Sequence, residues 1–138
     1  NSAKAGAGAP LAAGRVRVFQ ADDDRDLQFT GETTVKHTAV DEKVTLETGH
    51  AFDLAAERRM LTDRRVSDRE REFSVEVKLR NRKPGAVRIV VEEAVGGDVT
   101  VTAQSAPSTR KDANTLQWTL DVAPGKEAVL TYTARQRW

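Results

Sequence analysis

The sequence predicts an all-β fold, an immunoglobulin-like antiparallel β-sandwich of about seven to nine strands. Apolar and polar residues alternate along most of the chain, and this period of two is typical of strands with one buried face. Turn-forming residues interrupt the alternation roughly every 8–12 residues, which favours a sandwich or barrel over a fold with helical crossovers. With 16 Val, 14 Thr and 1 Ile, the composition is rich in the β-branched side chains that suit a pleated sheet.

The N-terminal segment differs from the rest of the chain. Nine of the twelve residues in 3–14 are Ala or Gly, and such a segment buries little apolar surface and loses much entropy when it is ordered. We therefore expect residues 1–14 to be a flexible linker and residues 15–138 to form a single β-sandwich domain. A linker here also predicts that the chain is part of a longer protein.

Three short alternating segments follow, at residues 15–20, 26–35 and 43–48. The Asp-rich residues 22–24 are expected to close the first hairpin, because Asp side chains bond their own backbone in turns. Further turns are expected at residues 48–50, 83–85, 96–98, 112–114 and 123–125, where Gly, Pro, Asp and Asn gather.

Residues 53–72 can be interpreted in two ways. They are rich in Ala, Glu, Arg, Leu and Met, which are good helix formers, so propensity alone predicts a helix over 53–66. The alternative is a strand over 51–60, with Phe52, Leu54 and Ala56 facing inward, followed by a charged loop.

The second half of the chain has the clearest alternation. Phe73, Val75, Val77 and Leu79 share one face of a strand over residues 72–80. The inward positions expected in the later strands are Val87, Ile89, Val91, Val99, Val101, Leu116, Trp118, Leu120, Val122, Ala128, Leu130, Tyr132 and Ala134. We expect an interior of plain hydrocarbon, with the polar edges of the buried Trp and Tyr rings each reaching a hydrogen-bond partner.

Composition argues against several functional classes. The 22 Lys and Arg nearly balance the 21 Asp and Glu, for a net charge of +1, whereas proteins that follow nucleic-acid phosphates concentrate basic charge. The absence of Cys excludes disulfides and thiolate metal sites. No apolar run approaches the ~18–20 residues of a membrane span. We therefore expect no nucleic-acid partner, no direct membrane insertion and no cofactor.

The residues that could carry chemistry do not form a recognisable site. His37 and His50 are the only histidines, and a catalytic zinc needs three protein ligands, so a carboxylate such as Glu42 or Asp53 would have to be the third. The acidic residues in 22–26 lack the Gly and the closing Glu of a calcium loop. No Ser lies in a nucleophile elbow. The sequence thus predicts a protein that is not an enzyme, and a hydrolase or metal site at His37, His50 and Asp53 is the less favoured alternative.

Six arginines lie within residues 58–71, interleaved with acidic residues. Charges of opposite sign at such spacing favour a solvated surface whose charges pair with one another. If this region does bind a partner, the candidate interaction surface is Arg58, Arg59, Arg64, Arg65 and Trp138. The terminal Trp is expected to close one end of the sandwich or to fill a groove on a partner domain.

Three segments carry a resemblance to a known family. They are HTAVDEKVTLETGHAFDLAAERR (37–59), REFSVEVKLRNRKPGAVRIVVEE (71–93) and KDANTLQWTLDVAPGKEAVLTYTARQRW (111–138). Together with the residues from 11 onward, they resemble the C-terminal domain of unknown function in bacterial mucoidy inhibitor A-like proteins. The resemblance implies an exported, periplasmic or otherwise extracytoplasmic protein, with an N-terminal domain and a helical region ahead of this module. It also implies that residues 51–59 are extended, which favours the strand over the helix, and it supplies no catalytic residues.

The function expected from these observations is a non-catalytic structural or protein-interaction module at the C-terminus of a longer bacterial envelope protein. Its expected partners are other domains of that protein, another envelope protein, or a second copy that adds to an edge strand. The alternative is a carbohydrate-binding module linked to exopolysaccharide, which would need two or three exposed, coplanar aromatic side chains.

Overall fold

The fold is known from a computed structural model that describes residues 13–21, 27–35, 43–47 and 54–138, with side chains from residue 55 onward. The described chain forms ten strands: β1 (Ala13–Ala21), β2 (Leu27–Val35), β3 (Lys43–Glu47), β4 (Leu54–Ser67), β5 (Glu70–Asn81), β6 (Val87–Ala94), β7 (Asp98–Gln104), β8 (Thr109–Asp112), β9 (Thr115–Val122) and β10 (Glu127–Arg137). The alternation of apolar residues does not indicate β8, because all four of its side chains are exposed.

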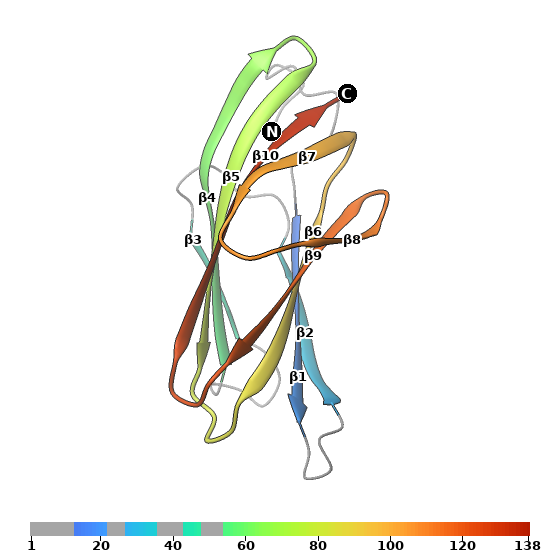
Figure 1. Ribbon diagram of the computed structural model, residues 1–138. Helices are drawn as coiled ribbons and strands as arrows, with labels where there is room; N and C mark the ends of the chain where they lie inside the picture. The colour runs from blue at the N-terminus through green and yellow to red at the C-terminus, as the bar shows by residue number, and fades with distance from the viewer. Residues whose placement is uncertain (1–12, 22–26, 36–42, 48–53) are drawn as a thin grey trace.

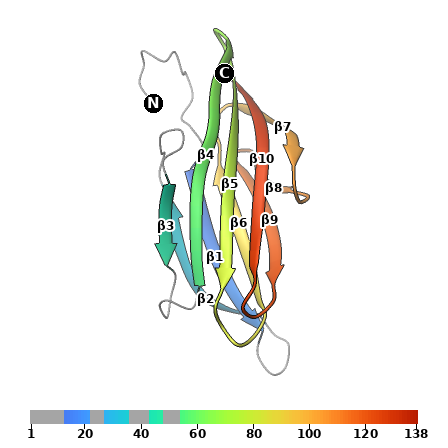
Figure 2. The same ribbon diagram turned by 90° about the vertical axis from the view of Figure 1, so that its left-hand side faces the viewer.

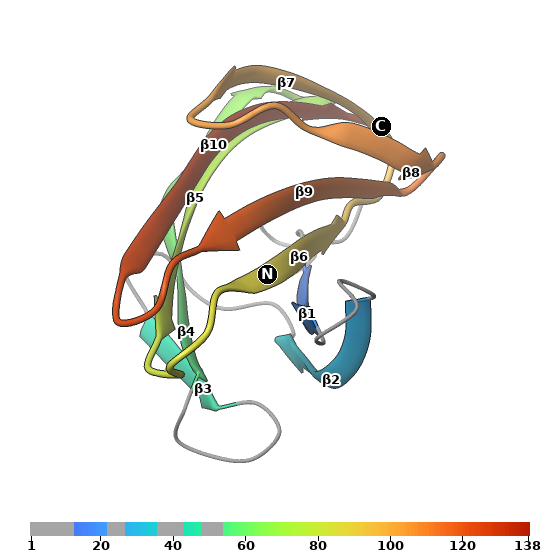
Figure 3. The ribbon, with the colours of Figure 1, turned by 60° about the horizontal axis from the view of Figure 1, so that its bottom comes forward.

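The strands form two five-stranded sheets that face each other (Figures 1 and 3). The strand order is β2-β1-β6-β9-β8 in sheet A and β3-β4-β5-β10-β7 in sheet B, which faces the viewer in Figure 2. Every pairing is antiparallel. The predicted all-β sandwich is confirmed, while the immunoglobulin-like detail stays a prediction.

The boundary of the predicted linker lies slightly too far along the chain. β1 begins at Ala13, where Ala13 and Gly14 pair with Ala94 and Glu93 of β6. Small residues can join a ladder because the pairing uses their backbone groups. The rest of the predicted linker lies outside the described residues, as do the predicted turns at 22–24 and 48–50.

Residues 54–67 form a strand, so the helix expected from propensity over 53–66 is wrong. The charged loop expected after residue 60 is also wrong, because β4 continues to Ser67 in a long hairpin with β5. Pairing with β5 and burial of one face decide the outcome over intrinsic propensity, as is common in sheets. Ala56 is buried as the strand interpretation predicts.

The interior follows the predicted alternation closely. The inward apolar residues of β5 are all at most 1% exposed. Tyr132 packs edge-on against Phe73, with 6.1 Å between ring centroids, and lies 4.6 Å from the Trp118 ring. The Trp118 indole N–H donates to the side-chain oxygen of Gln104 and to the Ala106 carbonyl, both at 3.2 Å. Both aromatic rings therefore have the polar partners expected for them, since Tyr132 bonds Glu93 as described below.

Asn81 ends β5 and joins the two sheets at one end of the sandwich. Its side chain is fully buried. The amide nitrogen lies 2.9 Å from the Gly85 carbonyl, 3.0 Å from the Val122 carbonyl and 3.3 Å from the Ala123 carbonyl. The side-chain oxygen accepts from the backbone N–H of Lys83 at 2.9 Å. This single amide therefore fixes the predicted turns at 83–85 and 123–125 relative to each other.

Candidate functional site

The residues predicted for a metal or hydrolytic site lie outside the described chain. His37, His50 and Asp53 are in this group, as is the acidic segment 22–26. Among the residues that the structure does describe, no group of three or more His, Asp or Glu side chains could hold a metal ion.

The interior contains a buried ion pair that joins the two sheets. Arg58 of β4 donates from Nη2 to Glu93 Oε1 at 2.7 Å and from Nε to Oε2 at 3.2 Å, which makes the contact bidentate. The Tyr132 hydroxyl of β10 donates to the same Oε1 at 2.6 Å. Arg58 is 2% exposed and Glu93 is fully buried. The expectation of a plain hydrocarbon interior is therefore wrong.

Arg58 must also be removed from the predicted interaction surface, because its guanidinium faces Glu93 inside the sandwich. The alternation could have indicated this position. Arg58 has the same parity as Ala56 and Met60, which face inward, and Glu93 has the same parity as Ile89 and Val91. A charged side chain is rarely buried, so the residue type at position 58 indicated an exposed arginine. The free-energy cost of burying the charge of Arg58 is offset because Glu93, on the opposite sheet, supplies the opposite charge.

The charges of this cluster satisfy one another. Burial acts to lower the pKa of Arg58, but the attraction of the Glu93 carboxylate outweighs burial and the pKa is raised. Burial raises the pKa of Tyr132 well above its ordinary value, and the negative charge of Glu93 adds to this effect. The phenol therefore stays protonated and the guanidinium stays charged. With every member at most 2% exposed, this cluster links the sheets and offers no reacting group to a substrate.

A second buried cation lies near the C-terminus. The Arg71 guanidinium donates to the Gln136 side-chain oxygen at 2.7 and 3.0 Å, and the Gln136 amide donates to the Gly96 carbonyl at 2.6 Å. The Trp138 ring lies over this guanidinium, 5.3 Å from it, and burial lowers the pKa of Arg71. Arg71 is thus another exception to the predicted solvated surface, and Trp138 lies at one end of the sandwich, consistent with the closing position expected for it.

The other arginines of this region gather at the same end of sheet B. The β4–β5 hairpin extends beyond β3, and the end of β10 runs beside it (Figure 2). Trp138 joins the hairpin through a hydrogen bond from its backbone N–H to the Arg69 carbonyl at 3.1 Å. We call the surface formed here the arginine end, and its residues are Arg64, Arg65, Arg69, Arg135, Arg137 and Trp138. It brings together Arg64, Arg65 and Trp138 of the predicted interaction surface, whereas Arg59 lies farther down β4, beside Glu76.

The guanidinium groups of the arginine end are more exposed than most of the carboxylates that pair with them. Glu72 is held by Arg64 at 3.0 Å and by Arg135 at 3.2 Å, and these hydrogen bonds lower its pKa. Its side chain is 25% exposed, whereas the Arg64 side chain is 60% exposed. The Glu70 side chain is 17% exposed beside Arg137 at 69%. The surface at this end therefore presents more positive charge than a count of charged residues indicates.

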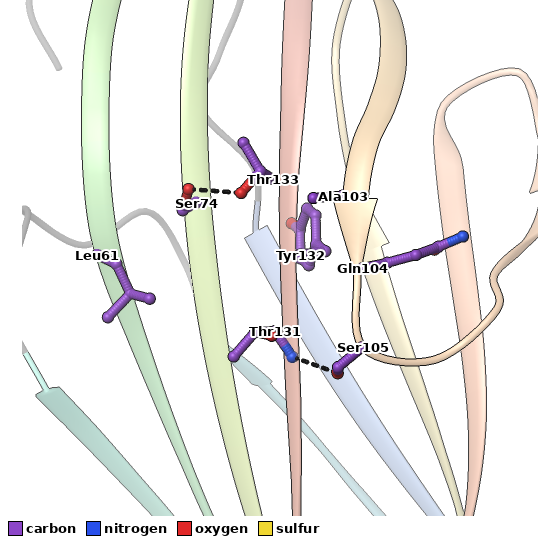
Figure 4. Close-up of a pocket in the computed structure, with 8 residues that line it drawn as sticks. All are labelled: Leu61, Ser74, Ala103, Gln104, Ser105, Thr131, Tyr132 and Thr133. Atoms are coloured by element: carbon purple, nitrogen blue, oxygen red, sulfur yellow. Dashed lines mark hydrogen bonds between the residues drawn. The ribbon is translucent and has the colours of Figure 1, made fainter.

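A shallow groove crosses the outer face of sheet B. Its volume is about 430 Å³, and Leu61, Ser74, Thr131 and Thr133 line it together with residues 103–105. Figure 4 shows the hydroxyls of Ser74 and Thr133 in contact, at 2.8 Å, and the backbone N–H of Thr131 donating to the Ser105 hydroxyl at 2.9 Å. These polar groups already satisfy one another. The one aromatic residue of the lining, Tyr132, has its ring buried in the core, so the groove lacks the stacking surface expected of a sugar site.

The two sheet edges at β7 and β8 are protected. Arg110 of β8 donates from Nη2 to the Val99 carbonyl of β7 at 2.7 Å, which occupies a backbone acceptor on that edge. β8 has only four residues and an irregular register with β9. Short, charged and irregular edges are the usual means by which proteins prevent unwanted strand pairing. These edges are therefore poor sites for the addition of a partner strand.

Compared with known proteins, the chain matches no family model, no curated protein and no solved structure. The described residues also contain no helix with the length and hydrophobicity needed to cross a membrane.

Proposed function

We propose that this chain is a non-catalytic structural or protein-interaction module, and that the arginine end is the surface that contacts its partner. The setting we propose is the one that the family resemblance implies, at the C-terminus of a longer bacterial envelope protein. Partners of this kind are another domain of that protein or a separate envelope protein.

The observation that carries the proposal is the unequal exposure of charge at the arginine end. The guanidinium groups of Arg64 and Arg137 extend into solvent while their carboxylate partners lie closer to the sheet. Arginine is favoured at interfaces because its planar fork recognises carboxylates with two hydrogen bonds. The aromatic ring of Trp138 beside these side chains adds a second residue type that is common at interfaces.

The interior supports a role as a rigid frame. The ion pair between Arg58 and Glu93 fixes one sheet against the other, and Asn81 fixes two turns at the far end. Buried polar groups that bond one another across a core can specify one arrangement of that core. A frame of this kind can hold the β4–β5 hairpin in place for a partner.

The proposal can be tested by site-specific photo-crosslinking in the full-length protein in its own cells. We would place the photoreactive residue at Ser67, at the tip of the β4–β5 hairpin, and at Lys126, an exposed position in the turn at the other end of the sandwich. The proposal expects a crosslink at Ser67, either to a separate protein or to another domain of the same chain, that is absent at Lys126. Equal crosslinking at both positions, or none at Ser67, would overturn the proposal.

Two further measurements test the competing functions. Turnover of any ester or phosphoester in a broad substrate panel, lost on His37→Ala, would replace the proposal with a hydrolase. Saturable binding of an acidic exopolysaccharide in calorimetry would favour the carbohydrate-binding alternative, and we expect no measurable affinity.

A further inference from the structure

We infer that the arginine end binds an extended acidic polypeptide segment with adjacent acidic residues, laid along the free edge of β4. This inference rests on the proposed function and names the chemistry of the partner.

The free edge is the part of β4 that follows Arg59 and runs to Ser67. β3 pairs with β4 only from Ala55 to Arg59, and within the described chain no strand pairs with the same side of β4 beyond that point. The register with β5 is irregular at residue 61 and again at residue 66, so the regular stretch is Thr62 to Arg65. Unpaired backbone N–H and C=O groups on such an edge can accept a short added strand.

The two arginines of this stretch lie on opposite faces of the hairpin. Arg64 is opposite Glu72, on the outer face of sheet B, and Arg65 is opposite Arg71, whose side chain faces inward. An added strand also alternates its side chains between the two faces. Two adjacent acidic residues in that strand would therefore meet one arginine each, and a guanidinium can hold a carboxylate with two hydrogen bonds.

Both arginines can turn to a partner without leaving a buried charge unpaired. Glu72 keeps its contact with Arg135 at 3.2 Å when Arg64 leaves it. Asp68, which pairs with Arg65 at 3.4 Å, has a fully exposed side chain. Exposed ion pairs contribute little to stability because water screens them. Each arginine can therefore exchange its own carboxylate partner, Glu72 or Asp68, for a carboxylate of the bound peptide at little cost. The backbone hydrogen bonds between the peptide and β4 then favour the bound state.

A polypeptide fits this surface better than a polysaccharide or a nucleic acid. Sugars and bases are commonly held by stacking on exposed rings. Here the Trp138 ring is already placed over Arg71, and Phe73 and Tyr132, the aromatic residues of β5 and β10, are both buried. The free backbone edge offers hydrogen bonds that only another main chain can match along its length.

The test is a binding titration with a labelled, capped octapeptide that carries two adjacent pairs of glutamates, measured by fluorescence anisotropy. One competitor peptide replaces the glutamates by glutamines, and the other keeps every glutamate and replaces the residues between the two pairs by proline, which removes backbone N–H groups without changing the charge. A polyuronate oligosaccharide serves as the acidic probe without a peptide backbone. The protein variant is Arg64→Gln with Arg65→Gln, and its control is Arg80→Gln with Arg88→Gln, which removes two exposed arginines that also form surface ion pairs.

We expect the glutamate peptide to bind and to weaken as salt rises, because exposed charges are screened. The Arg64/Arg65 variant should lose roughly tenfold in affinity, whereas the control should stay within about twofold. The glutamine and proline peptides should bind much more weakly than the glutamate peptide. Strand addition would be overturned if the proline peptide or the polyuronate bound as tightly as the glutamate peptide. Acidic recognition would be overturned if the glutamine peptide bound as tightly as the glutamate peptide. It would also be overturned if the Arg64/Arg65 variant and the control variant bound the glutamate peptide equally well.

The outcome is separable from that of the proposed function. A protein that crosslinks at Ser67 but has no acidic segment would leave the interaction module standing and overturn this inference. Absence of any crosslink, together with a peptide that does bind, would overturn the module while showing that the surface can recognise carboxylates.

Discussion

The buried ion pair between Arg58 and Glu93 yields the sharpest prediction about this fold. Replacement Glu93→Gln keeps the shape of the side chain but leaves the Arg58 guanidinium, 2% exposed, beside a neutral amide. Removing one partner of a buried pair costs about 3–5 kcal/mol, because the other charge stays out of water without compensation. We therefore expect the free energy of unfolding to fall by about this amount.

The matched variants separate charge from packing. Replacing both partners by apolar residues, Arg58→Met with Glu93→Leu, removes both charges and leaves the Tyr132 hydroxyl without its acceptor. That unsatisfied group should cost about 1–3 kcal/mol. Adding Tyr132→Phe removes it as well, so the triple variant should lie within about 1 kcal/mol of the natural protein, since buried pairs are often replaceable by well-packed apolar residues.

The assay is urea unfolding followed by circular dichroism, with linear extrapolation to water. Arg88→Gln serves as the control, because Arg88 and Asp121 form an ion pair with side chains 45% and 70% exposed, and its loss should be hardly measurable. A Glu93→Gln variant as stable as the Arg88→Gln control would refute burial of the charge. A triple variant as unstable as Glu93→Gln would refute the argument that unpaired charge is the cause.

Three further predictions concern single residues. Asn81→Ala should lower the free energy of unfolding by about 2–3 kcal/mol in the same urea assay, because several buried backbone groups lose their partner. The control Asn114→Ala, at an exposed position, should have little effect, and equal effects of the two variants would contradict the role of Asn81. Burial raises the pKa of Tyr132 in the folded state, so above pH ~10 the unfolded chain loses this proton first and the free energy of unfolding should fall as the pH rises. If the free energy of unfolding of a Tyr132→Phe variant fell equally steeply with pH, other groups would be the cause. Gly125 has a φ of 70° with open space around it, so Gly125→Ala should lower the free energy of unfolding by about 1–2 kcal/mol from backbone strain alone. Gly125→Asn should lower the melting temperature less than Gly125→Ala does, and equal decreases would contradict backbone strain as the cause.

The sequence was sufficient for the fold class and for most of the core. Alternation along β5, β9 and β10 placed the apolar side chains correctly, because the period of two in a strand is fixed by backbone geometry and needs no knowledge of the partner strand. The turns at 83–85 and 123–125 were predicted on similar grounds, since Pro and Gly restrict or permit particular backbone angles.

Residues 53–72 show where local reasoning fails. Helix propensity indicated a helix over 53–66, and the strand interpretation ended at residue 60 with a charged loop after it, but pairing with β5 makes residues 54–67 one continuous strand. The same pairing buries Arg58 and Arg71 and leaves Arg64 and Arg65 exposed, a distinction that residue type does not provide.

By itself, then, the sequence determined that this chain forms paired strands with one apolar face each, because that property depends on neighbours along the chain. Only the tertiary structure decided which charged residues enter the interior and which form the arginine end. The free energy of a buried charge depends on whether an opposite charge lies within hydrogen-bond distance, and Glu93 reaches Arg58 across the sandwich from a position 35 residues away in the chain.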